Sequence, residues 1–183
     1  MTFTDKNSQS LSGIITARRN RALDRQGYIS LGMEILFLIL VGLFMLTQVF
    51  LITQVKGNAM FPALKDGDLL IAFRMQQDYA KKDVIVYTVD GETHIGRIVA
   101  RATDVVMMDQ SGNLLVNGTN QTGEIMYPSY AKEACSYPLA VPEDHVFVLG
   151  DYRTQAEDSR DFGPISMDDV QGKIITIVRR RGL

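Results

Sequence analysis

Few side chains in this sequence have the types and neighbours that covalent or metal chemistry requires. Cys135 is the only cysteine, and neither a second cysteine nor a nearby histidine accompanies it. We therefore interpret Cys135 as a small apolar filler and His145 as a structural residue. We expect no metal site and no cofactor.

The stretch KGNAMFPALKDGD, residues 56–68, directly follows a long apolar run and would lie at a membrane surface. Near its start, Ala59 supplies only a methyl group, which can neither attack a carbonyl nor give up a proton. What this site does therefore depends on the elements around Ala59.

The element before this loop is an uncharged run of 21 residues, Ile35 to Val55. At about 1.5 Å of rise per residue it can span a bilayer core of roughly 30 Å. A buried core helix is shorter and has a polar stripe, and a cleaved signal peptide has only about 7–15 apolar residues before a small-residue cleavage site. We predict a tail at 1–30, a retained transmembrane anchor at 31–55 and a β-domain at 56–183.

The charges that flank the apolar run predict its orientation. Residues 1–34 hold five Lys and Arg against three Asp and Glu, whereas residues 56–183 hold 14 against 18. Positive flanks favour the cytoplasm, so we expect a single-pass cell-membrane protein with a cytoplasmic N-terminus and an extracellular C-terminal domain. The net charge of −2 gives no reason to expect a nucleic-acid partner.

The extracellular part has the pattern of short strands, rich in Val, Ile and Leu and separated by Gly, Asp and Asn. The predicted strands are DLLIAFRM, DVIVYTV, THIGRIVAR, DVVMMD, NLLVNG, HVFVLGD and GKIITIVRR. Residues 119–142 are interpreted as an irregular insertion, and only a short turn near 166–170 suggests helix. The fold class is predicted as mainly β after one N-terminal transmembrane helix.

Three blocks, GNAMFPAL (57–64), THIGRIVARATD (93–104) and VLGDYRTQAEDSRDFGPI (148–165), resemble type I signal peptidases of the Gram-positive kind. LKDGDLLIAF and GNLLVNG match that family's intervening strands. The resemblance covers about residues 30–180, in order and with the anchor in the right place. It implies the signal peptidase I-like β-domain.

The resemblance also implies that the catalytic groups of the family are missing. The family uses a Ser nucleophile, a Lys general base and a Ser that orients the Lys ammonium. These three positions are occupied by Ala59, Gly96 and Ala156. None of the three side chains can handle a proton.

What the resemblance retains is structural. Arg97, Asp158, Ser159 and Arg160 match residues that brace the floor of the family's site, and an Asp between two Arg side chains can make bidentate bonds. Three features depart from the family pattern: Ala63, Tyr152 and the segment ARATD. The resemblance implies that ARATD alters the wall of the site that follows position 96.

His94 is the candidate for a replacement base, because eukaryotic relatives of the family use His at the Lys position. His94 lies two residues before Gly96, on the same face of a strand, but about 6.6 Å away along it. At that distance it cannot reach the nucleophile's position, and Ala59 has no proton to lose. We expect His94 to be an ordinary exposed or strand-packed residue.

Two functions from different classes follow from the resemblance. The favoured one is a non-catalytic, chaperone-like membrane protein that assists sortase-driven pilus assembly by binding pilin or sortase, through Ala59, Met60, Pro62 and Gly96 of the old peptide cleft. The alternative is a signal peptidase masked by an engineered substitution at Ala59 or working with another base. Loss at three separate positions favours the first.

Overall fold

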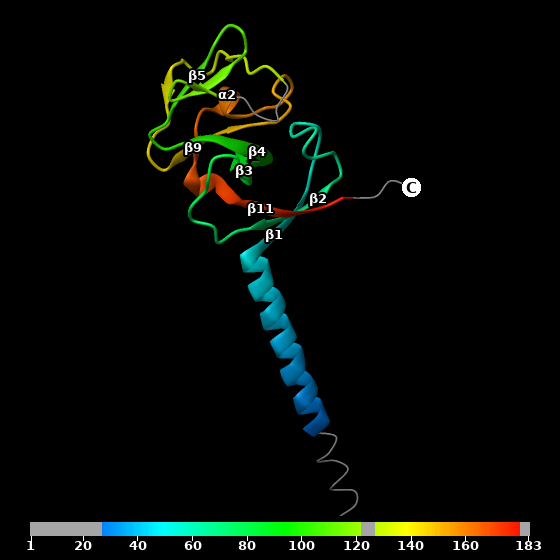
Figure 1. Ribbon diagram of the computed structural model, residues 1–183. Coiled ribbons are helices and arrows are strands. Elements are labelled where there is room, and N and C mark those ends of the chain that lie inside the picture. The colour runs from blue at the N-terminus through cyan, green and yellow to red at the C-terminus, as the bar shows by residue number, and fades with distance from the viewer. Residues whose placement is uncertain (1–26, 122–126, 180–183) are drawn as a thin grey trace, which may run out of the picture. The chain divides into compact units, whose positions relative to one another are not determined.

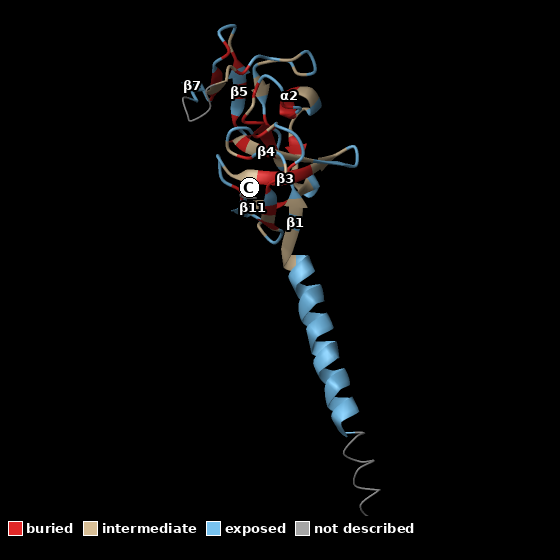
Figure 2. Ribbon diagram, turned by 90° about the vertical axis from the view of Figure 1, so that its right-hand side faces the viewer, coloured by how far each residue is buried: buried red, intermediate tan, exposed pale blue. Residues whose placement is uncertain are grey.

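The computed structural model describes residues 27–121 and 127–179, and the chain divides into two compact units, residues 1–47 and 48–183. The helix Gly27–Val49, 23 residues long, is long and apolar enough to cross a membrane. Its side chains are exposed from Gly27 to Gln48 (Figure 2). An apolar surface without protein neighbours is consistent with a membrane anchor. Most of the predicted tail lies outside the described residues.

The predicted anchor boundaries are corrected at both ends. Residues 27–30, assigned to the tail, are helical, and the helix ends at Val49. Residues Phe50–Gln54 form strand β1, which pairs antiparallel with β2 (Leu69–Phe73) from Phe50↔Phe73 to Gln54↔Leu69. An uninterrupted apolar run hides this change because periodicity cannot separate the end of a helix from a following apolar strand.

The second unit contains two antiparallel sheets (Figure 1). The larger has the order β1-β2-β11-β3-β4-β9-β10, and the smaller has the order β7-β6-β5-β8. Beyond β1 and β2, the elements are β3 (Val84–Val89), β4 (Glu92–Arg101), β5 (Val105–Met108), β6 (Leu114–Val116), β7 (Thr119–Asn120), β8 (Leu139–Ala140), β9 (His145–Leu149), α2 (Ser159–Phe162), β10 (Ile165–Ser166), the 3-10 turn Met167–Asp169 and β11 (Val170–Val178).

The mainly β prediction is confirmed, and each of the seven predicted strands is present as β2, β3, β4, β5, β6, β9 or β11. The predicted turn near 166–170 is the 3-10 turn Met167–Asp169. The sequence pattern missed the very short strands β7, β8 and β10 and the single-turn helix α2, because two to four residues carry too little periodicity.

Tight turns and apolar clusters hold the site's strands together. Asp90 and Gly91 join β3 to β4 with positive φ angles of 51° and 83°, as a type I′ hairpin turn requires. β3, β4 and β9 then contribute Ile85, Tyr87, Ile98 and Val148 to one buried cluster. These three adjacent strands form a rigid support for the candidate site.

Candidate active site

The floor of the site is a buried ion pair at the start of α2. Asp158 is 0% exposed and Arg160 is 2% exposed. Arg160 Nε donates to Asp158 Oδ1 and its Nη2 donates to Oδ2, both at 2.8 Å. The same carboxylate accepts from the backbone N of Gly150 and Arg160 at 3.1 Å. One carboxylate therefore caps α2 and ties it to the end of β9.

Ser159 strengthens this connection, because its Oγ accepts from the backbone N of Val148 at 2.9 Å. Ser159 is itself 0% exposed. The predicted bracing roles of Asp158, Ser159 and Arg160 therefore correspond to contacts between α2 and β9.

The prediction for Arg97 needs a correction, because its ion-pair partner is Asp151 and not Asp158. Arg97 Nε donates to Asp151 Oδ1 at 2.8 Å, and Nη2 donates to Oδ2 at 2.6 Å. Arg97 lies opposite Leu149 in the β4–β9 ladder, which brings the carboxylate two residues later within reach. The brace is thus two bidentate pairs and not one Asp between two Arg side chains.

Arg153 is a buried cation that the sequence reasoning missed. It is 5% exposed, donates from Nε to the carbonyl of Gly150 at 2.8 Å, and donates from Nη1 to Ser129 Oγ. Burial lowers the pKa of its guanidinium to about 10. In the sequence it stands in a polar loop, DYRTQ, where nothing distinguishes it from an exposed arginine.

Two of the three positions at which the resemblance implies catalytic groups, Ala59 and Ala156, meet at Gly150. A Cβ built on Gly150 would lie 2.2 Å from the Ala156 Cβ and 2.7 Å from the Ala59 carbonyl oxygen. That carbonyl also accepts from the backbone N of Tyr152 at 2.9 Å. Ala59 and Ala156 therefore converge as the resemblance implies, but they bring only methyl and backbone groups.

The third position, Gly96, faces side chains that fill the space in front of it. A Cβ there would lie 2.5 Å from Val148 Cγ1 and 3.4 Å from Tyr87 Cε1. Tyr87 is 0% exposed, and its hydroxyl has no hydrogen-bond partner among the described residues. Burial, followed by the charges of Asp158 and Asp161, raises the pKa of that hydroxyl. Val148 and Tyr87 thus occupy the volume that a longer side chain at position 96 would need.

His94 is held by aromatic neighbours. Its ring centroid lies 5.6 Å from that of Tyr87, nearly parallel, and 5.1 Å from that of Phe162. This arrangement agrees with the predicted strand-packed role. His145 contacts the carbonyl of Glu143 through Nδ1 at 2.7 Å, a local contact of the loop before β9.

The residues predicted to bind a partner differ in how accessible they are. Pro62 is exposed and Ala59 is half-buried, whereas Gly96 is buried. Met60 is 1% exposed and packs with Val55, Leu64 and Leu70. The inclusion of Met60 and Gly96 in a contact surface is therefore corrected, because both lie inside the domain.

An aromatic group covers the loop beside Ala59. The ring of Tyr152 lies 6.2 Å from that of Phe61 and 4.6 Å from that of Tyr127, measured between centroids. Tyr152 is one of the departures from the family pattern. It replaces a small polar side chain with a packed ring next to the empty nucleophile position.

Within residues 27–121 and 127–179, no group of three or more His, Cys, Asp or Glu side chains is arranged to hold a metal ion.

Lys132, which sequence reasoning did not select, brings an amine to the site. Its Nζ donates to the Ala156 carbonyl at 2.9 Å and pairs with Asp161 Oδ2 at 2.6 Å. In both contacts the Lys132 ammonium acts as a donor.

The unpaired Tyr87 hydroxyl leads to a stability prediction. Tyr87→Phe is expected to raise the free energy of unfolding by about 1 kcal/mol, because a buried hydroxyl without a partner is unfavourable. In the unfolded chain a tyrosine ionises near pH 10, whereas the folded-state pKa of Tyr87 is higher. The proton on the Tyr87 hydroxyl therefore makes its full contribution to folding stability below pH 10, and this contribution is lost as the pH rises above 10.

Phenylalanine has no proton to lose, so the difference in free energy of unfolding between Tyr87→Phe and the wild type should increase above pH 10. Urea titrations at pH 8 and pH 10.5 measure it, with the partly exposed Tyr127→Phe as the control. A Tyr87→Phe variant that is destabilised at pH 8 would contradict the prediction and reveal a bonded hydroxyl.

Comparison with known proteins identifies the family of this chain. The family described as signal peptidase, peptidase S26, matches residues 28–179. The chain is 30% identical to a probable thylakoidal processing peptidase 2 of Arabidopsis thaliana over 135 residues, 67% of this chain and 36% of that protein. It is 31% identical to signal peptidase I P of Bacillus subtilis subsp. natto over 134 residues, 64% of this chain and 70% of that protein.

The chain spans well under half the length of the first plant relatives, 36% and 40%. In structure it is similar to a signal peptidase I of Enterococcus faecalis, with a TM-score of 0.46, 24% identity, and coverage of 55% of this chain and 98% of that one. The family match extends over nearly all of the apolar helix, both sheets and the site. The chain belongs to the signal peptidase S26 family.

Proposed function

We propose that this chain is a membrane-anchored, non-catalytic member of its family, which binds a partner at the cell surface without cleaving it. The observation that carries the proposal is the site itself, where Ala59 and Ala156 converge on Gly150 and present no hydroxyl or amine. Gly96 adds no side chain, and its space is filled. The surrounding brace of Asp158, Arg160, Arg97 and Asp151 is complete.

The retention of the brace supports binding as the remaining role. Two bidentate ion pairs brace the domain around this centre, so that a peptide-binding surface can persist there without catalytic groups. Main-chain hydrogen bonding to an extended peptide needs no nucleophile. From the resemblance to signal-peptidase-like proteins of pilus gene clusters, we infer that the partner is a pilin subunit or the sortase that links pilins.

The absence of turnover is the first expected result. The detergent-solubilised chain should not cleave a signal-peptide substrate at any pH from 5 to 10, because neither a nucleophile nor a base is present. Product formation is measured by mass spectrometry, with an active signal peptidase as positive control. Turnover that survives repurification and the His94→Ala substitution would overturn the non-catalytic proposal.

The pilus role has its own test, which does not depend on catalysis. Crosslinking in the native membrane, followed by capture of the chain, should recover a pilin or a sortase. Recovery of neither, from cells that assemble pili, would reject this role and leave the non-catalytic proposal intact.

The alternative function, a peptidase that uses another base, has Lys132 as its structural support. Its ammonium reaches the carbonyl of Ala156, beside the old site. Because Lys132 is paired with Asp161 and Ala59 has no hydroxyl, we favour a structural role. If Ala59→Ser became active and Lys132→Ala abolished that activity, Lys132 would instead be the base.

A further inference from the structure

A cavity of about 780 Å³ lies beside the old catalytic centre and has a strongly cationic lining. Its wall is formed by the loop after Ala59, the segment before β3, the middle of β4, the β5–β6 turn and the chain after β9. Its volume lies within the range of cavities that bind ligands in proteins. The cavity includes neither Ala59 nor Ala156.

Four cations line this cavity, and two of them have no carboxylate partner. Lys81 is paired with Asp104, and Arg97 with Asp151. Lys82 and Arg153, which also line the cavity, make no ion pair within the described part of the chain. The lining therefore has two positive charges that its own carboxylates do not balance.

Arg153 is the more informative of the two. It is 95% buried, and its direct hydrogen bonds go to neutral acceptors, the Gly150 carbonyl and the Ser129 hydroxyl. The carboxylates of Asp151 and Asp158 act on it electrostatically, but each is held bidentately by another arginine, Arg97 or Arg160. A buried charge without a counterion in direct contact is unfavourable, and the usual remedy is a further opposite charge nearby. An anion in the cavity would provide it.

We propose that this cavity binds an acidic polypeptide segment of a partner protein. The cations come from three segments of the wall, Lys81 and Lys82 before β3, Arg97 in β4 and Arg153 after β9, which suits several carboxylates along a chain better than one small ion. In the lining, Asn113 and Gln121 donate from their side-chain amides to Asp109 and to the Thr119 carbonyl, whereas the exposed Asn120 offers an amide that can pair with a peptide main chain. The site would act whether or not the chain cleaves anything, so it goes beyond the proposed function.

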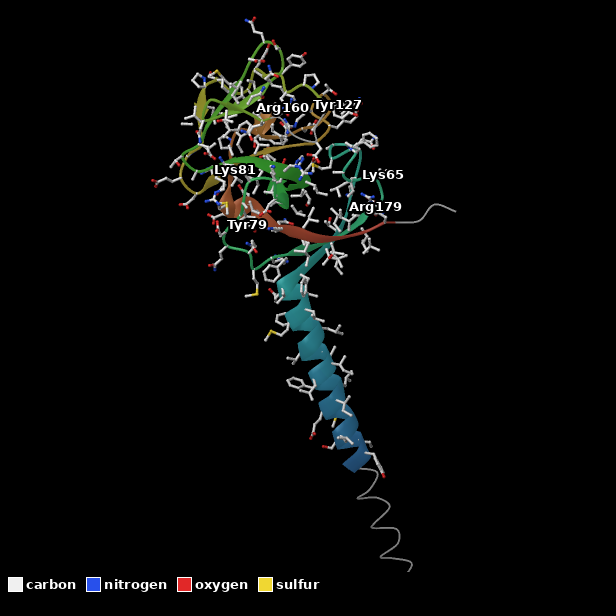
Figure 3. The ribbon with its side chains drawn as sticks, viewed as in Figure 1. Lys65, Tyr79, Lys81, Tyr127, Arg160 and Arg179 are labelled. Atoms are coloured by element: carbon white, nitrogen blue, oxygen red, sulfur yellow. The ribbon has the colours of Figure 1, made fainter. Side chains whose placement is uncertain are left out.

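The test uses the full chain in detergent and two fluorescent peptides, one with Asp and Glu at alternate positions and one with Asn and Gln in their place. Anisotropy should show binding of the acidic peptide only, weakening as salt is raised. Lys82→Glu should raise the Kd for it by about tenfold. Lys65→Glu, an exposed lysine outside the lining, is the matched control; Figure 3 labels it with Lys81 and Tyr127 of the lining.

Because Arg153 is buried, Arg153→Gln, which removes the charge but keeps a long polar side chain, tests its role with less risk to the fold than truncation to alanine. A loss of binding at an unchanged melting temperature would support the proposal. Equal affinity for the two peptides, or equal effects of Lys82→Glu and Lys65→Glu, would overturn it. Full competition by millimolar inorganic phosphate, or Lys82-dependent binding of phosphatidylglycerol vesicles without binding of the peptide, would also overturn it by identifying a phosphate site.

Discussion

Replacing Arg160 with alanine is expected to lower the free energy of unfolding of the β-domain by about 3–5 kcal/mol. The substitution leaves the Asp158 carboxylate, which is 0% exposed, without its bidentate partner. It also removes the donor to the Arg153 carbonyl, at 2.6 Å. Thermal melting and urea unfolding of the detergent-solubilised chain, followed by circular dichroism, measure the loss.

Arg101→Ala is the control, because Arg101, at the end of β4, pairs with an Asp78 side chain that is 89% exposed and otherwise donates to the Tyr79 carbonyl. A pair so open to water contributes less than about 1 kcal/mol. Arg97→Ala should lie between the two, since the Arg97 side chain is 23% exposed while Asp151 is 3% exposed. If Arg160→Ala and Arg101→Ala shift the melting equally, the buried pair does not support the domain.

The strands of this protein could be predicted because most of them alternate or are continuously apolar and end at Gly, Asp or Asn. β4 shows the reliability of this signal, since its observed bounds, Glu92–Arg101, differ from the predicted run by one residue. β1 shows its limit. Phe50–Gln54 continues the apolar run of the helix, and only pairing with β2 determines that it is a strand.

The site could be predicted as a set of positions but not as a set of contacts. Family motifs assigned Asp158 and Arg160 to one brace, and these two residues, which are close in sequence, form an ion pair in the structure. The partner of Arg97 depends on the β4–β9 register, which no local pattern contains. Arg153 and Tyr87 were missed for a related reason. Burial of a polar side chain is decided by tertiary packing, and their segments look like an ordinary loop and an ordinary strand.

The packing around Gly96 changes what reactivation would require. Ala59→Ser alone is expected to give no measurable cleavage, because a Ser hydroxyl without a base stays protonated near neutral pH. Catalytic groups that act as a unit are strongly non-additive, and the loss of one member typically reduces the rate by about 10⁴ to 10⁶. The family's three groups would therefore have to be restored together, as Ala59→Ser, Gly96→Lys and Ala156→Ser.

This triple variant is also expected to be inactive, because its new lysine has no room. The Cβ at position 96 would meet Val148 Cγ1 at 2.5 Å, and the Tyr87 ring fills the space beyond. Overpacking of this kind costs about 1–3 kcal/mol and displaces the side chain that causes it. Adding Val148→Ala and Tyr87→Ala should make space for the lysine side chain. Any recovered turnover should therefore appear only in the variant that carries all five substitutions.

Melting curves must accompany each activity assay, so that an unfolded variant is not mistaken for an inactive one. Thr93→Lys, at an exposed position of the same strand, shows the effect of a new lysine that meets no neighbour. Turnover in the triple variant without the two space-making changes would show that β4 and β9 adjust easily around position 96. Robust cleavage by Ala59→Ser alone would be more serious, because a working base would then survive at this site and Ala59 alone would be silencing an enzyme.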